Sequence, residues 1–370
     1  MKNLIEKLEK EILILNDTIV FKNDALETTV YTSKGSFADE LKHFATSFNN
    51  LFKSNKSTNR LNAYIVRDDK LFSTALELLN DDILTTTPGL KCFNQATIST
   101  SIAKCTQDTN YYLMRCYDYF IYIFDKSKQR CYMLIKNNKK VLTMINILIL
   151  TPYLMYGELF AVHGGLVNKD NKNVLINNSS LGGKTTFAIL FASNGWDIIT
   201  EETTYITNDG KILPFNIRNY FNIRAGTYLN FYDFFREKNI IINNFINMKD
   251  KSFEELYALG KLEQESIDFE RIGKFKELKI KHITHSLNVS IKETPGFIIE
   301  SCSPVENVKS FLELSLAPTV LLFKELLNYN SINTELRKEQ LISIFKNTNS
   351  YKIISDFNYK SNFDNIINKI

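Results

Sequence analysis

The residues of this chain best suited to chemistry lie at positions 178–185, where the sequence reads Asn-Ser-Ser-Leu-Gly-Gly-Lys-Thr. The segment approaches the pattern G-x-x-x-x-G-K-[ST], in which backbone N–H groups at a helix N-terminus surround a phosphate. In this pattern the lysine neutralises the β- and γ-phosphates and the next hydroxyl binds Mg²⁺, roles that fall to Lys184 and Thr185. We therefore expect a site for Mg²⁺ and a nucleoside triphosphate, ATP or GTP. The predicted nucleotide-binding residues are Asn178, Ser179, Ser180, Leu181, Gly182, Gly183, Lys184, Thr185 and Thr186.

The first glycine of the pattern is replaced by Asn178, at a position that often takes a left-handed backbone conformation. Asparagine tolerates that conformation better than other non-glycine residues, so the loop survives the replacement. The alternative is a chance Gly-Gly-Lys-Thr in a surface loop. The context opposes it, because an apolar strand at 174–176 precedes the segment and an apolar helix at 185–193 follows it.

Three further polar residues are expected beside this loop. His163 lies in the apolar strand predicted at 161–167, and Glu201 and Glu202 follow the strand predicted at 198–200. With this spacing the histidine, the loop and the acidic pair converge at one edge of a sheet. Carboxylates there suit phosphoryl transfer, which needs positioning and charge neutralisation more than covalent chemistry. Two structural alternatives remain open, a solvated strand end for the glutamates and a hydrogen-bonded core position for the histidine.

Two arginines and two histidines complete the candidates. Arg218 and Arg224 follow the acidic pair, and an arginine suits the charge on a transferring phosphoryl group, although surface arginines are common. His282 and His285 have the spacing of a metal pair, but no Cys or acidic third ligand is near, so we expect them to be structural or solvated.

With these pieces in this order, the chain resembles the HPr kinase/phosphorylase superfamily and its relatives in peptide-modifying gene clusters. Members have a histidine at a strand start, a turn, a second strand, a serine-containing Gly-Lys-Ser/Thr loop, a helix ending in glycine, and an acidic pair. The matching segments here are 163–167, 178–185, 195–196 and 198–202, and the resemblance weakens beyond about residues 160–206. It implies an ATP- and Mg²⁺-dependent kinase.

The resemblance also implies residue roles. In the family the acidic pair is the base for the acceptor hydroxyl and part of the Mg²⁺ shell. This assigns catalysis to His163, Lys184, Glu201 and Glu202 and metal binding to Thr185 and Glu202, while leaving open which glutamate is the base. The family has two aspartates at this point, so each longer glutamate moves its carboxylate oxygens by one methylene.

The acceptor expected from the resemblance is a Ser or Thr hydroxyl of a peptide or small protein, recognised by residues 1–140. A small-molecule hydroxyl kinase is the nearest alternative. A regulatory or scaffold protein without transfer activity is another, suggested by Asn178 and the glutamates. A carboxykinase-like enzyme would need a cluster of metal-binding His and Lys residues before the loop, which His163 alone does not supply. Phosphorolysis and a homo-oligomer are left open.

Composition excludes several classes. The chain has 370 residues, with 45 basic and 41 acidic side chains interspersed. Nucleic-acid binding would need a concentrated basic face, and because the sequence shows none, we do not expect it. Its five cysteines are scattered without a zinc-site spacing, which indicates reduced thiols. Residues 1–10 alternate charged and aliphatic side chains rather than forming a signal peptide, so we expect a cytoplasmic protein.

The apolar stretch 141–162 is about as long as the ~20 residues that span a bilayer. It contains Asn146, Pro152, Gly157 and Glu158 and continues directly into a predicted strand. We therefore expect a buried helix and no membrane span.

The predicted fold is α/β, with an α+β region at 1–140 and, from the resemblance, an HPr-kinase-like P-loop nucleotide-binding domain at 141–370 with a mixed sheet and flanking helices. The Lys-rich turn at 136–140 marks the boundary. Helices are expected at 4–15, 71–79, 185–193, 231–245, 251–259, 308–315, 334–346 and 363–370. Strands are expected at 28–32, 62–66, 117–124, 131–136, 161–167, 174–176, 198–200, 278–283 and 297–300.

Overall fold

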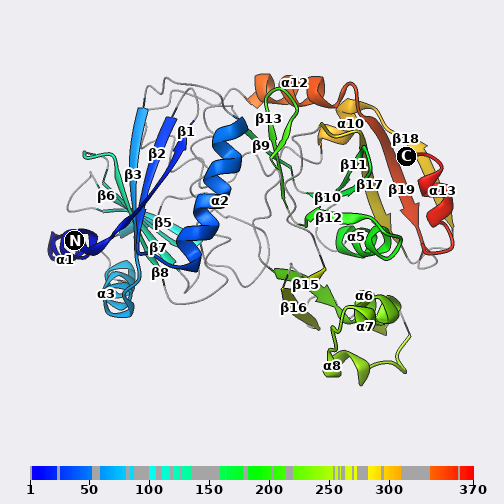
Figure 1. The fold of residues 1–370 in the computed structure, drawn as a ribbon, viewed down its shortest axis with the longest axis horizontal. Helices are drawn as coiled ribbons and strands as arrows, with labels where there is room; N and C mark the ends of the chain where they lie inside the picture. The colour runs from blue at the N-terminus through cyan, green and yellow to red at the C-terminus, as the bar shows by residue number, and fades with distance from the viewer. Residues whose placement is uncertain are drawn as a thin grey trace. The chain divides into compact units, whose positions relative to one another are not determined.

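The computed structural model (Figure 1) divides into two compact units, Met1–Glu158 with Leu316–Ile332, and Leu159–Ser315 with Asn333–Ile370. We call these unit 1 and unit 2. The structure describes residues 2–22, 26–51, 59–80, 84–86, 100–105, 111–116, 120–125, 127–135, 159–162, 164–177, 182–201, 203–213, 220–252, 255–256, 259, 263–268, 271–272, 282–292, 296–309, 334–356 and 359–370. The predicted boundary at 140/141 lies outside these residues and stays a prediction.

Unit 1 contains a mixed sheet in which the described strands follow the order β1-β2-β3-β8-β7-β6-β5-β4. Neighbours β2, β3 and β8 run parallel, and the other neighbouring strands pair antiparallel. The strands are β1 (Asp17–Lys22), β2 (Leu26–Thr32), β3 (Asn59–Val66), β4 (Leu84–Thr86), β5 (Thr100–Cys105), β6 (Tyr111–Cys116), β7 (Phe120–Asp125) and β8 (Arg130–Ile135).

Three helices bury apolar side chains against this sheet. Helices α1 (Lys2–Glu11) and α3 (Asp69–Asn80) contribute Leu8 and Phe72 to a cluster that also contains Tyr132 of β8. Helix α2 (Ser36–Leu51) packs on β1, where the rings of Phe48 and Phe21 meet edge to face at 5.9 Å.

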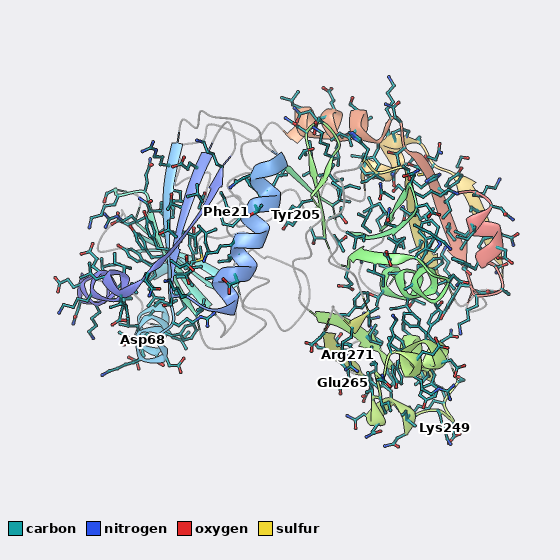
Figure 2. The ribbon with its side chains drawn as sticks, viewed as in Figure 1. Phe21, Asp68, Tyr205, Lys249, Glu265 and Arg271 are labelled. Carbon is teal, nitrogen blue, oxygen red and sulfur yellow. The ribbon has the colours of Figure 1, made fainter. Side chains whose placement is uncertain are left out.

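A side-chain cap fixes the start of α3. The carboxylate of Asp68, labelled in Figure 2, accepts hydrogen bonds of 2.8 Å from the backbone N–H groups of Lys70 and Leu71. These N–H groups have no partner within the helix, so an N-cap aspartate stabilises the helix start by about 1 kcal/mol.

Unit 2 is built on a second mixed sheet with the order β12-β10-β11-β17-β19-β18. Strands β11, β17 and β19 are parallel, and the remaining neighbours are antiparallel. The strands are β10 (Gly164–Lys169), β11 (Lys172–Asn177), β12 (Asp197–Thr200), β17 (His285–Ile291), β18 (Phe297–Ser301) and β19 (Asn349–Ser355).

Two smaller sheets accompany it. The first has the order β14-β13-β9, from β9 (Leu159–Val162), β13 (Thr204–Thr207) and β14 (Ile212–Leu213), and Tyr205 of β13, labelled in Figure 2, is buried in it. The second pairs β15 (Tyr220–Arg224) with β16 (Gln264–Asp268). The described helices of unit 2 are α5 (Lys184–Ser193), α6 (Ala225–Asn230), α7 (Tyr232–Glu237), α8 (Asn243–Ile246), α10 (Pro304–Lys309), α12 (Thr334–Phe345) and α13 (Phe363–Ile367).

Helix α5 is buried on almost every side because it lies between the sheet and the C-terminal residues. Its end has a regular structure. The N–H of Gly195, at φ +82°, bonds to the carbonyl of Ala192, and the N–H of Trp196 bonds to that of Phe191. The rings of Phe191 and Trp196 meet edge to face at 5.0 Å. This is a Schellman motif with its apolar contact, which requires a residue such as glycine that accepts positive φ.

Mixed α and β content with mixed sheets agrees with the predicted α/β class at that coarse level. The β7–β8 and β10–β11 hairpins, helix α5, strand β12 and helix α12 confirm predictions within one to three residues at their described ends. Residues 117–119 lie outside the described residues.

Other predictions were wrong or incomplete. The helix expected at 231–245 is two short helices, α7 and α8, because Asn239 between them has φ +56°, a left-handed conformation that ends a helix. Leu159 and Phe160, expected to end a buried helix, belong to strand β9, and the strand expected at 161–167 is divided between β9 and β10, which lie in different sheets. Residues 141–158 lie outside the described residues, and among those described no helix is long and apolar enough to cross a membrane.

Candidate functional site

Three strands bring the candidate segments to one edge of the unit 2 sheet. Strands β11 and β12 are both antiparallel to β10 between them, so their C-terminal ends lie beside its N-terminal end. The register pairs Gly164 with Asn177, and Leu166 with Thr200. The chain therefore leaves β11 into the candidate loop at the edge where β12 ends before Glu201 and where β10 begins after position 163.

Several predicted site residues lie outside the described residues. These are His163, Asn178, Ser179, Ser180, Leu181, Glu202 and Arg218. In the sequence, His163 directly precedes Gly164 and Glu202 directly follows Glu201. Residues 178–181 lie between Asn177 and Gly182, and Arg218 lies two residues before Tyr220. The roles predicted for their side chains stay predictions.

The described half of the loop leads directly into α5. Gly183 is the N-cap residue, with φ +101° and ψ +6°, a conformation that favours glycine. A Cβ on Gly183 would come within 2.7 Å of Cδ1 of Ile291, at the end of β17. The backbone conformation therefore favours glycine at this position, and any larger residue would also require the Ile291 side chain to move.

Lys184 is the first residue of α5 and is only 8 % exposed. A lysine is rarely this buried unless it is paired. It lies at the positive end of the helix dipole, where anions are favoured. This position concentrates positive charge beside the start of α5.

The next residue connects the helix to the acidic pair. The Thr185 hydroxyl donates a hydrogen bond of 2.9 Å to Oε1 of Glu201, and Glu201 is 4 % exposed with Oε2 also shielded from solvent. A half-buried hydroxyl and a buried carboxylate, both oxygen ligands, therefore face each other at the start of α5. The structure brings together Lys184, Thr185 and Glu201, as the spacing predicted.

Thr186, the last predicted nucleotide-binding residue, points elsewhere. Its hydroxyl lies 2.9 Å from that of Thr227, and both residues are buried. This contact joins the first turn of α5 to α6. Arg224, half-buried at the end of β15, immediately precedes α6, so the same contact brings its backbone position toward the start of α5.

The two histidines lie away from the loop. His285 pairs in register with Val174 at the opposite end of the parallel strands, and its Nδ1 is 2.9 Å from the Thr284 hydroxyl. Burial, with a smaller contribution from the positive charge of Lys172, lowers the pKa of His285. His282 is exposed. No group of three or more His, Cys, Asp or Glu residues suited to a metal occurs among the described residues.

Sequence reasoning missed several residues of this site. Ile291 packs on Gly183 from a strand far along the chain, where no local signal marks it. Thr200 and Thr204 bracket the acidic pair, and their hydroxyls lie 2.6 Å apart. The sequence Thr-Glu-Glu-Thr-Thr at 200–204 could have indicated these two residues, because threonines that flank buried acidic residues are candidates to orient them.

No protein-family model matches this chain, and no curated protein is significantly similar to it in sequence.

Proposed function

We propose that unit 2 is an ATP- and Mg²⁺-dependent kinase of the HPr kinase/phosphorylase type, which transfers the γ-phosphate to a hydroxyl. The observation that carries this proposal is the 2.9 Å hydrogen bond between Thr185 and Glu201 at the start of α5. In P-loop enzymes the hydroxyl after the lysine and an acidic residue at the end of a nearby strand together hold Mg²⁺. Thr185 and Glu201 have these positions in the chain.

The phosphate-binding part of the proposal rests on the turn before α5. Gly183 carries no side chain of its own at the N-cap position, and Lys184 adds charge at the positive end of the helix. A triphosphate needs such a cradle of N–H groups and one lysine. These features favour ATP or GTP as the ligand.

The residues also fit the metal. Mg²⁺ prefers oxygen ligands and is commonly held by one or two carboxylates together with substrate phosphates. The Thr185 hydroxyl and the Glu201 carboxylate supply such oxygens in a shielded position. When bound, Mg²⁺ would neutralise charge on the phosphates. We accordingly assign Glu201 to the metal shell, in place of the Glu202 expected from the sequence.

This assignment leaves Glu202 as the base. In the proposed reaction Glu202 accepts the proton of the acceptor hydroxyl, whose oxygen forms a bond to the γ-phosphorus. The bond between that phosphorus and the β–γ bridging oxygen breaks, and ADP leaves. Lys184 neutralises charge that develops on the phosphates. His163, adjacent to Gly164 at the same edge, is proposed to contact the phosphate side.

The glutamates in place of the family aspartates do not weaken this proposal. Strand β12 ends at Thr200, and the longer side chain of Glu201 reaches the Thr185 hydroxyl from there. The contact favours an active site over a scaffold that has lost its chemistry. The proposed acceptor is a Ser or Thr of a peptide or small protein, with unit 1 contributing recognition, and a small-molecule hydroxyl is the second candidate.

The test is transfer of labelled phosphate. The full chain is incubated with Mg²⁺, γ-labelled ATP and acceptor pools that contain peptides, small proteins or small molecules. We expect label on Ser or Thr of one peptide or protein, and none with the Lys184→Ala chain. Labelled small molecules would favour the second candidate. If the chain binds ATP but transfers no labelled phosphate to any pool, kinase activity is contradicted. The result would then favour a regulatory or scaffold protein without transfer activity.

A further inference from the structure

A chain of hydrogen bonds crosses the site edge behind the acidic pair. The backbone N–H of Leu166 donates to the Thr200 hydroxyl at 3.0 Å, and the Thr204 hydroxyl donates to the Gly164 carbonyl at 2.9 Å. The two hydroxyl oxygens lie 2.6 Å apart, and both threonines are fully buried. The chain of bonds thus begins and ends on β10.

The proton positions in this chain follow from counting donors. A threonine hydroxyl has one proton. Thr204 gives its proton to Gly164, so Thr200 must donate to Thr204, and the Thr200 oxygen accepts from Leu166. All three bonds therefore run in one direction, an arrangement in which each bond polarises and strengthens the next.

The chain of bonds exists because the backbone pairing of β10 and β12 is interrupted here. Leu166 pairs with Thr200 but Val167 pairs with Ile198, so Ile199 is an extra residue on β12 and forms a β-bulge. A bulge disrupts the ladder and turns the strand end in a new direction. The threonine hydroxyls supply bonds for the Leu166 N–H and the Gly164 carbonyl at this irregularity.

The glycines of β10 allow the same close approach. A Cβ on Gly165 would lie 2.9 Å from the carbonyl oxygen of Glu201, and one on Gly164 would lie 2.9 Å from that of Ile176. The backbone at Gly164 and Gly165 therefore packs closely against β11 on one side and against the backbone of Glu201 on the other.

We infer that Thr200 and Thr204 are positioning residues, which fix the chain before and after Glu201 to the backbone of β10 at Leu166 and Gly164. This inference rests on the proposed function, in which Glu201 contributes to the metal shell. Residues that orient a metal ligand typically affect metal affinity or activity 10–100-fold, so roughly that range applies here. Glu201 itself touches Thr185, and the threonines act through it.

The experiment compares Thr204→Val, which removes the hydroxyl at nearly constant volume, with Thr204→Ser, which keeps it. Thr207→Val is the matched control, because Thr207 is buried on the same strand but bonds to Asp209 and Lys211 in the β13–β14 turn. Two quantities are measured in the full chain: hydrogen exchange of peptides covering 164–166 and 199–204, and affinity for a fluorescent ATP analogue with Mg²⁺ and with EDTA.

We expect Thr204→Val to raise exchange in both peptides and to reduce the Mg²⁺-dependent gain in affinity about tenfold, while Thr204→Ser and Thr207→Val keep wild-type values. Thr200→Val breaks the chain at its other hydroxyl and replaces Thr204→Val if that variant does not fold. Wild-type exchange and wild-type Mg²⁺ dependence in Thr204→Val would overturn the inference. Failure of the wild-type chain to bind the analogue, with exchange still raised in Thr204→Val, would overturn the proposed function and leave the positioning role intact.

Discussion

Oγ1 of Thr185 and Oε1 of Glu201 lie 2.9 Å apart and connect the first turn of α5 to the end of β12. The contact crosses β10, the strand between β11 and β12 in the sheet. Strand β12 ends at Thr200, so Glu201 is the first residue after the strand.

Replacing Lys184 by methionine should lower ATP affinity by about 10–100-fold, with Mg²⁺ or with EDTA, because a charged hydrogen bond contributes about 1.5–3 kcal/mol. Equilibrium titration with a fluorescent ATP analogue measures this. Lys169→Met is the control, since Lys169 bonds to the Asn194 carbonyl near the other end of α5. Equal loss in both variants would indicate a general effect on the helix rather than a phosphate contact.

Gly183→Ala should destabilise the chain by about 2–5 kcal/mol, because it combines a left-handed backbone strain of about 1–2 kcal/mol with overpacking of about 1–3 kcal/mol against Ile291. Thermal unfolding measures the change. Gly296→Ala separates the two causes, since Gly296 also has positive φ but a Cβ added there would meet no heavy atom within 4 Å beyond its chain neighbours. If both substitutions lower Tm equally, the contact with Ile291 has no energetic weight.

Gly165→Ala should cost about 1–3 kcal/mol by overpacking, because the new Cβ meets the backbone oxygens of Glu201 and Thr200 rather than a movable side chain. The backbone of Glu201 must then shift, so the Mg²⁺-dependent part of ATP affinity should also fall. Chemical denaturation and analogue titration measure the two effects. If the Mg²⁺ dependence of ATP affinity is unchanged in Gly165→Ala, the site tolerates displacement of the Glu201 backbone.

Stability should fall on acidification partly through His285. Its pKa is lowered in the folded chain, so the unfolded chain binds more protons as pH drops below the ordinary value of 6.5, and folding loses stability there. Above pH 6.5, His285 makes no pH-dependent contribution to the free energy of unfolding. In denaturant titrations at several pH values, the free energy of unfolding should fall less steeply with decreasing pH in His285→Gln than in the wild type. His282→Gln, which changes an exposed histidine, is the control. If the free energy of unfolding depends equally on pH in the wild type and in both variants, His285 does not cause the loss of stability.

The sequence predicted the local parts of this site because each has a short-range signal. The turn at 168–173 between two apolar runs predicted the β10–β11 hairpin, and Gly195 predicted the end of α5. The spacing of Lys184 and Glu201 predicted their convergence, since a strand, loop, helix and strand in succession return the chain to the same sheet edge.

Long-range contacts had no such signal. Strand β17 pairs with the loop-bearing strand β11 from far along the chain, and β19 pairs in turn with β17, so no signal close to the loop in sequence indicates either pairing. The contact of Ile291 with Gly183 depends on that pairing. The β-bulge at Ile199 likewise follows from register between strands, which a single strand sequence does not specify. The threonine hydrogen bonds were therefore visible only in the fold.

The most direct measurement of the central claim is the affinity of the chain for ATP with Mg²⁺ and with EDTA, in the wild type and in Glu201→Gln. The account predicts that Mg²⁺ tightens binding by about tenfold or more in the wild type, and that most of this gain is lost in Glu201→Gln. Glu300→Gln, an exposed change on the edge strand β18, should behave as the wild type. No ATP binding by the wild type, or a full Mg²⁺ effect in Glu201→Gln, would contradict the account.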